Sequence, residues 1–328
     1  MFCCTANQCL DKHWASSSVA FQIGITCGKG PLALSRSYQH TLAGPAICAG
    51  IGLHSGQRVR LSIRPAPAGS GVVFVRTDVE GDNRVSVSAE AVVQTRLCTV
   101  ISNAAGVTVA TIEHLMAAMA ALDIDNAVVE LDGPEVPIMD GSSALFVQLL
   151  DRAGRRRQEA ERQYIEILDT VEVIQGDKFA RLSPSDAFEV AFEIEFANPL
   201  IGRQRVDLAV DEDSFRSELA DCRTFGFLHE VEALRAQGLA RGGSLDNAVV
   251  IDGERLLNPE GLRRPDEFVR HKALDAVGDL YVLGAPIIGR FEGVRAGHAL
   301  NNLVARALMD KPEAFRLTTL NADMAQAG

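Results

Sequence analysis

Two short segments pair a histidine with a carboxylate at spacings that suit metal chemistry. His271 and Asp275 lie four residues apart, so within a helix they occupy one face, one turn apart. Glu113 directly precedes His114 at the predicted start of another helix. Two histidines and an aspartate suit an open zinc site whose fourth position is left for water, and an adjacent carboxylate can take a proton from that water. The spacing of His271 and Asp275 alone is weak evidence, because charged residues opposite an apolar stripe occur on any amphipathic helix, and the Glu113-His114 pair strengthens the metal interpretation.

A third candidate is His298, which follows a predicted strand and is expected in a loop that could present its imidazole to a substrate. Other chemistries find less support. The sequence has no GxGxxG after a strand and no GxxxxGK[ST] motif, so nucleotide-cofactor folds are not indicated. A cysteine hydrolase would need a thiol paired with a histidine, and no motif pairs Cys98 or Cys222 with one.

The composition indicates an ordinary globular protein. The chain has 328 residues, 47% hydrophobic and 23% charged, which favours about two domains. Its net charge of −11 argues against a nucleic-acid partner. No run approaches the ~18 apolar residues of a membrane-spanning helix, so no integral membrane segment is expected. Seven cysteines without a CxxC pair indicate reduced thiols and a cytoplasmic protein. Residues 1–36 lack signal-peptide features and are expected to form a poorly structured extension.

From Ser37 onward the pattern predicts strands followed by helices. Alternating or β-branched runs predict antiparallel strands at 58–68, 71–78, 84–93 and 97–102, with a hairpin turn at 103–106. A helix is predicted from Glu113 to Leu122 and a strand at 126–133, before another helix. The charged run 151–163 is interpreted as a solvated linker or helix end that separates two halves.

The second half repeats this order. Strands are predicted within 164–196, a long helix opens at Pro265 and ends before Gly284, and a strand follows at 287–294. On that helix Val269, Ala273, Ala276 and Leu280 form an apolar stripe, and His271 and Asp275 are expected on the opposite side. The fold class is therefore α+β, with two similar domains at 37–160 and 161–328, each a sheet packed with helices in layers.

Four segments together carry a resemblance to a known family: TIEHLMAAMAALDIDNAVVELDGPEVPIMDGSS, CRTFGF, DEFVRHKALDAVGDL and GHALNN. In order and spacing they resemble the UDP-3-O-acyl-N-acetylglucosamine deacetylases, from about residue 37 to residue 320. The resemblance implies zinc-dependent hydrolysis of the N-acetyl group of UDP-3-O-acyl-GlcNAc, which releases acetate and commits the sugar to lipid A biosynthesis. It also implies two α+β domains, each with a small insert, and one Zn²⁺ per chain; we expect a monomer.

The resemblance assigns catalytic roles residue by residue. It implies that Glu113 is the general base and that His298 is the general acid, oriented by Asp279. Thr224 would help bind the tetrahedral oxyanion. The zinc ligands that it implies are His114, His271 and Asp275.

The resemblance also implies how the substrate is held. Lys272 would bind the diphosphate and Phe196 would lie under the uracil, while Arg295 stands where the family often has a second phosphate-facing lysine. Residues 227–250 resemble a βαβ insert whose apolar passage holds the acyl chain, with Leu228, Val231, Leu245 and Ala248 in its lining. The residues assigned to substrate binding are Lys272, Phe196, Arg295, Phe225, Leu228 and Val231.

A non-catalytic UDP-lipid-binding metalloprotein is the alternative interpretation. Its metal would be structural, and a structural zinc site is normally closed by a fourth protein ligand. The matching motifs offer three ligands, which favours the enzyme.

Overall fold

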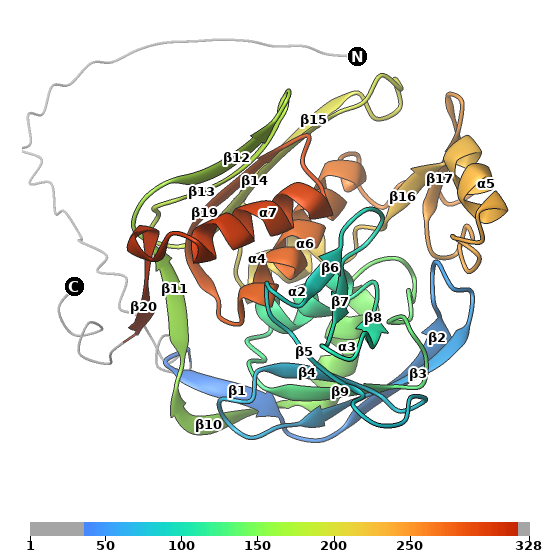
Figure 1. The fold of residues 1–328 in the computed structure, drawn as a ribbon. Helices are drawn as coiled ribbons and strands as arrows, with labels where there is room; N and C mark the ends of the chain where they lie inside the picture. Colours follow the sequence, from blue (N-terminus) through green and yellow to red (C-terminus); the bar gives the residue numbers. More distant parts are fainter. Residues whose placement is uncertain (1–35, 321–328) are drawn as a thin grey trace, which may run out of the picture.

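A computed structural model of the chain describes residues 36–320, so the predicted extension lies, apart from Arg36, outside the described residues. Two β-sheets lie on opposite sides of a central group of helices (Figure 1). Each half of the chain supplies one of these sheets, helices of the central group and a small insert. The predicted α+β architecture of two similar layered units is therefore confirmed.

The sheet of the first half has five strands in the order β2-β3-β9-β4-β5. Along β3, Val59, Leu61 and Ile63 are buried and alternate with more exposed residues, as expected for a strand with one face on the core. Two helices cover this sheet. The bounds are β2 Ala46–Ile51, β3 Arg58–Pro65, β4 Val72–Arg76, β5 Arg84–Ser86, α2 Glu113–Ala121, β9 Ala127–Leu131 and α3 Ala144–Ala153.

Two predicted strand relations differ from the structure. The runs at 58–68 and 71–78 do form strands β3 and β4, but β9 lies between them, antiparallel to β3 and parallel to β4. The run at 84–93 splits, because its first residues form β5 and its last begin a separate three-stranded sheet. That sheet is the first insert and contains the predicted hairpin turn at 103–106; its strands are β6 Val92–Gln94, β7 Val100–Ser102 and β8 Thr108–Val109.

The sheet of the second half has seven strands, with β19 near its centre. The strand β19 is parallel to β14 and β11 and antiparallel to β13. The strand bounds are β11 Gln163–Ile167, β12 Val171–Gln175, β13 Lys178–Ser183, β14 Phe188–Glu195, β15 Arg203–Ala209, β19 Ile287–Val294 and β20 Phe315–Thr319. The helices are α4 Glu212–Ser214, continued by a π-helical turn Phe215–Leu219, α6 Glu267–Leu280 and α7 His298–Met309.

The second insert has the βαβ order expected for it. Strand β16 (Phe225–Phe227), helix α5 (Leu228–Ala236) and strand β17 (Val249–Asp252) follow one another, and β16 pairs parallel with β17. A short strand β18 (Arg255–Leu256) pairs with β17. The insert projects from the helical layer beside the edge of the first sheet (Figure 1).

The interpretation of 151–163 as a linker or helix end is wrong for most of the segment. Arg155–Glu161 form strand β10, which pairs antiparallel with β1 (Tyr38–Leu42) in a two-stranded ribbon. Most β10 side chains remain exposed, so a strand can form here although its residues are charged. Arg162 is 1% exposed and donates to Asp125 at 2.7 Å. The division of the chain at residue 160 stays a prediction.

The two helices that carry the candidate ligands pack directly on each other. A Cβ atom at Gly278 of α6 would lie 2.0 Å from the carbonyl oxygen of Glu113, so only glycine permits this approach to the first turn of α2. Because α6 lies between the two layers, both of its sides are buried, and His271 and Asp275 are only 1% and 2% exposed. In residues 36–320, no helix combines the length and apolar character needed to cross a bilayer.

Candidate metal centre and active site

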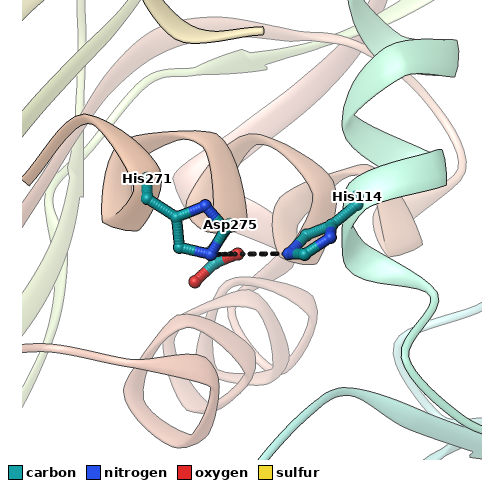
Figure 2. A group of neighbouring side chains, drawn as sticks. All are labelled: His114, His271 and Asp275. Atoms are coloured by element: carbon teal, nitrogen blue, oxygen red, sulfur yellow. Dashed lines mark ion pairs between the residues drawn. The ribbon is translucent and has the colours of Figure 1, made fainter. Parts of the chain in front are cut away.

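Three buried side chains converge where α2 meets α6. His114 comes from the start of α2, and His271 and Asp275 come from successive turns of α6 (Figure 2). Asp275 Oδ1 lies 3.4 Å from Nε2 of His114 and 3.3 Å from Nε2 of His271. The possible ligand atoms of the three residues lie within 4.8 Å of one another. The helical spacing predicted for His271 and Asp275 is therefore present, and the fold brings His114 to them from about 160 residues away in the chain.

The chemistry of these donors fits a cation. His271 Nδ1 lies 3.0 Å from the carbonyl oxygen of Cys222, an acceptor, so Nδ1 carries the proton and Nε2 presents a lone pair. Burial lowers the pKa of His271 to about 3, which keeps the ring neutral. Its lone pair faces Asp275 Oδ1, which accepts no hydrogen bond within residues 36–320. A cation placed among these atoms would satisfy the opposed lone pairs, and two nitrogens with one carboxylate oxygen are a donor set that suits Zn²⁺.

Lys272 lies at the edge of this centre. Its Nζ donates to Asp275 Oδ2 at 2.9 Å, and the side chain is 22% exposed. Burial acts to lower the pKa of Lys272, but the Asp275 carboxylate outweighs it and raises the pKa. Lys272 therefore presents a fixed positive charge beside the ligands.

Glu113, which precedes His114 at the start of α2, is a buried carboxylate. Its Oε2 accepts the backbone N–H of Thr99 at 3.0 Å. Burial raises the pKa of Glu113, although the neighbouring His298 acts in the opposite direction. Its Oε1 lies 4.0 Å from His298 Nε2, so the two groups face each other across a short gap.

The expectation that His298 lies in a loop is wrong, because it is the first residue of α7. The helix extends this far because Leu300, Val304 and Leu308 give the segment a helical apolar period. Nδ1 of His298 lies 2.8 Å from Asp279 Oδ2, which leaves Nε2 directed at the centre, 3.9 Å from Asp275 Oδ2. Burial alone would lower the pKa of His298, but the Asp279 carboxylate outweighs it and raises the pKa to about 9. The imidazole is therefore protonated at neutral pH.

An aromatic cluster connects the centre to the second insert. Phe225 lies with its ring centroid 6.5 Å from that of His271 and 5.9 Å from that of Phe196. Lys272 Nζ lies 5.7 Å from the centroid of the Phe225 ring. Thr224 precedes this cluster and is two residues from Cys222, whose carbonyl holds His271. The predicted residues Thr224, Phe225 and Phe196 thus lie on one continuous path from the metal centre.

A mostly apolar cavity of about 390 Å³ continues this path under helix α5. Thr224 and Phe225 are in its lining, together with Leu53 and Leu97 from the first half of the chain. The insert supplies the remaining apolar wall, which includes Leu228, Val231, Leu234, Leu245 and Ala248. All four residues predicted to line an acyl passage therefore line this one cavity.

The thiols near the centre are unsuited to nucleophilic catalysis. Burial raises the pKa of Cys98 to about 12 and that of Cys222 to about 12. Both therefore remain protonated at neutral pH, which argues further against a cysteine hydrolase.

Comparison with known proteins identifies the family. The family model described as UDP-3-O-acyl N-acetylglycosamine deacetylase matches residues 39–310. The chain belongs to this family. A relative named UDP-3-O-acyl-N-acetylglucosamine deacetylase from Phenylobacterium zucineum (strain HLK1) is 68% identical over 291 residues, covering 88% of this chain and 99% of that protein.

More distant relatives carry the same name. The protein from Myxococcus xanthus (strain DK1622) is 50% identical over 85% of this chain and 88% of its own length. The protein from Shewanella sp. (strain W3-18-1) is 48% identical over 87% of this chain and 94% of its own length. The family and the deacetylase function predicted from the four motifs are thereby confirmed, while the roles of individual residues stay predictions.

Arg295 is the predicted site residue of this deacetylase that the structure connects least to the centre. It follows β19 with a left-handed backbone (φ 49°), and its guanidinium forms ion pairs with Asp177 and Glu195. Two carboxylates already neutralise the side chain, which is 32% exposed. Phosphate binding by Arg295 would have to compete with them, and it stays a prediction.

Several residues at the site of the deacetylase were not predicted from the sequence. Asn301 donates to Asp279 Oδ2 at 2.9 Å. It lies three residues after His298, so a helix predicted to include both residues would have placed them on the same face. Thr99 contacts two of the predicted catalytic carboxylates, and nothing in its local sequence indicates this. Leu53 and Leu97 line the cavity from a distant part of the chain.

Proposed function

We propose that this deacetylase is zinc-dependent and hydrolyses the N-acetyl group of UDP-3-O-acyl-GlcNAc, with acetate as the product, in the committed step of lipid A biosynthesis. The observation that carries the proposal is the convergence of His114, His271 and Asp275 on one buried point, flanked by Glu113 and His298. When bound to these three ligands, Zn²⁺ would supply a Lewis acid that polarises the amide carbonyl and lowers the pKa of water.

The chain's own residues would move the protons. Glu113 accepts a proton from the attacking water, which adds to the acetyl carbon. Thr224 donates a hydrogen bond to the carbonyl oxygen as negative charge develops on it. His298, kept protonated by Asp279, gives its Nε2 proton to the sugar nitrogen as the C–N bond breaks. One water is consumed, and the amine and acetate are formed.

The path from Lys272 to the cavity supports an assignment of substrate parts. Lys272 would hold the diphosphate, with Arg295 as a weaker second partner, and Phe196 would lie against the uracil. The apolar lining around Leu228 and Val231 suits a fatty acyl chain, because an apolar wall offers no penalty to methylene groups. We also propose that the protein acts as a cytoplasmic monomer; free thiols at Cys48, Cys98 and Cys222 support a reducing compartment.

Metal analysis combined with a deacetylation assay tests this function. The purified chain should contain one equivalent of Zn²⁺ and release acetate from UDP-3-O-acyl-GlcNAc in proportion to its metal content. A chain that binds the substrate tightly and holds zinc, yet releases no acetate, would instead support the non-catalytic UDP-lipid-binding metalloprotein.

Replacing Lys272 by alanine should weaken binding of the diphosphate. We expect KM for the substrate and the inhibition constant of UDP to rise about 10-fold, because one charge-assisted contact is lost, with a smaller change in kcat. Lys178→Ala removes a lysine on β13 that is exposed and serves as the matched control. Unchanged UDP inhibition together with a lower zinc content would show that Lys272 acts by holding Asp275 instead.

Narrowing the cavity should discriminate between substrates by acyl length. Val231→Trp places a large ring in the passage, so kcat/KM for a long-acyl substrate should fall about 10-fold or more, while a short-acyl analogue is little affected. Leu317→Trp, at a position on β20 that is 57% exposed, controls for the added ring. Equal losses with long and short substrates would contradict an acyl chain in this cavity.

A further inference from the structure

Thr99 lies between the two carboxylates to which opposite proton-transfer roles are assigned. It immediately precedes β7 in the first insert and is fully buried. Its backbone N–H donates to Glu113 Oε2 at 3.0 Å, and its Oγ1 hydroxyl donates to Asp279 Oδ1 at 2.5 Å. One residue of the first half thus contacts both the base on α2 and the carboxylate on α6 that orients the acid.

Both oxygens of the Asp279 carboxylate have side-chain hydrogen-bond partners. Thr99 occupies Oδ1, while His298 Nδ1 and Asn301 Nδ2 both approach Oδ2, at 2.8 and 2.9 Å. Asp279 is fully buried, and a buried carboxylate is tolerated only where its oxygens are so satisfied. Without the Thr99 hydroxyl, Oδ1 would lose a short, charge-assisted bond, and the carboxylate could rotate away from the imidazole.

The same hydroxyl is also close to α7. Asn302 Nδ2 lies 3.5 Å from Thr99 Oγ1 and donates to the carbonyl oxygen of His298 at 3.0 Å. Thr99 therefore adjoins the backbone as well as the side-chain partner of His298. A buried threonine hydroxyl can find a hydrogen-bond acceptor without contacting a carboxylate. Thr41 is equally buried, and its hydroxyl donates to the Asn126 carbonyl at 2.6 Å.

We propose that Thr99 is a positioning residue that fixes the base Glu113 and the Asp279–His298 pair relative to each other across the two halves of the chain. The inference rests on the roles proposed for Glu113 and His298. Thr99 touches neither the three metal ligands nor the reacting atoms in this arrangement; it acts through the groups that do. Its effect should fall on kcat, because alignment of the proton donor matters in the transition state and not in substrate binding.

The test compares three variants of the full-length chain. Thr99→Val removes the hydroxyl but keeps the shape and the N–H to Glu113, and kcat should fall about 10-fold with KM and zinc content unchanged. Thr99→Ser restores the hydroxyl and should recover most of the activity. Thr41→Val removes an equally buried hydroxyl outside the site, so it should lower the melting temperature without lowering kcat. If Thr99→Val does not fold, Thr99→Ala replaces it.

A double variant separates positioning from general damage. In a His298→Ala background the Thr99 hydroxyl has no imidazole to align, so adding Thr99→Val should cause no further loss of kcat. Wild-type kcat in Thr99→Val, or the same 10-fold loss in both backgrounds, would overturn the inference. If the wild-type chain releases no acetate, or if His298→Ala is fully active, the proposed function itself has failed instead.

Discussion

Removal of the metal is expected to abolish acetate release, with a loss on the order of 10³-fold or more, and one equivalent of Zn²⁺ should restore it. The reason is that the residues proposed as base, acid and oxyanion donor include no nucleophile stronger than water, while metal coordination can contribute several kcal/mol of transition-state stabilisation. The measurement is activity after dialysis against a chelator, followed by titration with zinc and metal analysis.

Replacing each proposed ligand singly should show which residues bind the metal. His114→Ala, His271→Ala and Asp275→Ala should each lower zinc content and activity together, since each removes one of three ligands. His40→Ala is the matched control, because His40 is also buried but lies outside the group. Full zinc occupancy in His114→Ala would contradict the assignment, because the site would then not draw on helix α2.

The three residues proposed as metal ligands were predicted from local signals and from family resemblance. On α6, Pro265 and Gly284 mark the boundaries of a helix that the structure places at Glu267–Leu280 followed by a short turn to Leu283. Within a helix of known bounds, the spacing of His271 and Asp275 alone sets them on one face. The roles proposed for Glu113 and His114 come from the resemblance of their motif to the family, and the structure places both residues in the first turn of α2.

Features that depend on distant segments were not predictable in this way. The strand β10 carries charged side chains on both faces, so its sequence resembles a linker, and only its pairing with β1 makes it a strand. Strand β9 enters the sheet between β3 and β4 although these two are neighbours in the chain. Gly278 matters because α2 approaches it, and Thr99 matters because Asp279, 180 residues later, accepts its hydroxyl. No periodicity in the local sequence indicates such contacts between distant segments.

Replacement of the base or the acid should lower kcat while the metal stays bound. Glu113→Gln keeps the size of the side chain but cannot accept a proton, and His298→Gln cannot donate one; each should lose on the order of 10²-fold or more in kcat. Zinc content should match the wild type, because neither residue belongs to the three ligands. Loss of zinc in Glu113→Gln would mean that a ligand had been mistaken for a base.

The pH dependence should identify which group limits each side of the profile. His298 must be protonated to donate, so activity should fall as pH rises through its pKa, which Asp279 raises to about 9 against the effect of burial. A bound divalent cation adds positive charge nearby and lowers that pKa, so this limb is expected at or below pH 9. Glu113 must be ionised to accept a proton; burial raises its pKa, whereas the bound cation lowers it, so activity should fall on the acid side as Glu113 becomes protonated. The profile of kcat/KM should therefore be bell-shaped, with apparent pKa values that belong to the coupled pair.

The basic limb of this profile should disappear in His298→Gln and persist in Glu113→Gln. A basic limb that survives in His298→Gln would belong to another group and would remove His298 as the acid.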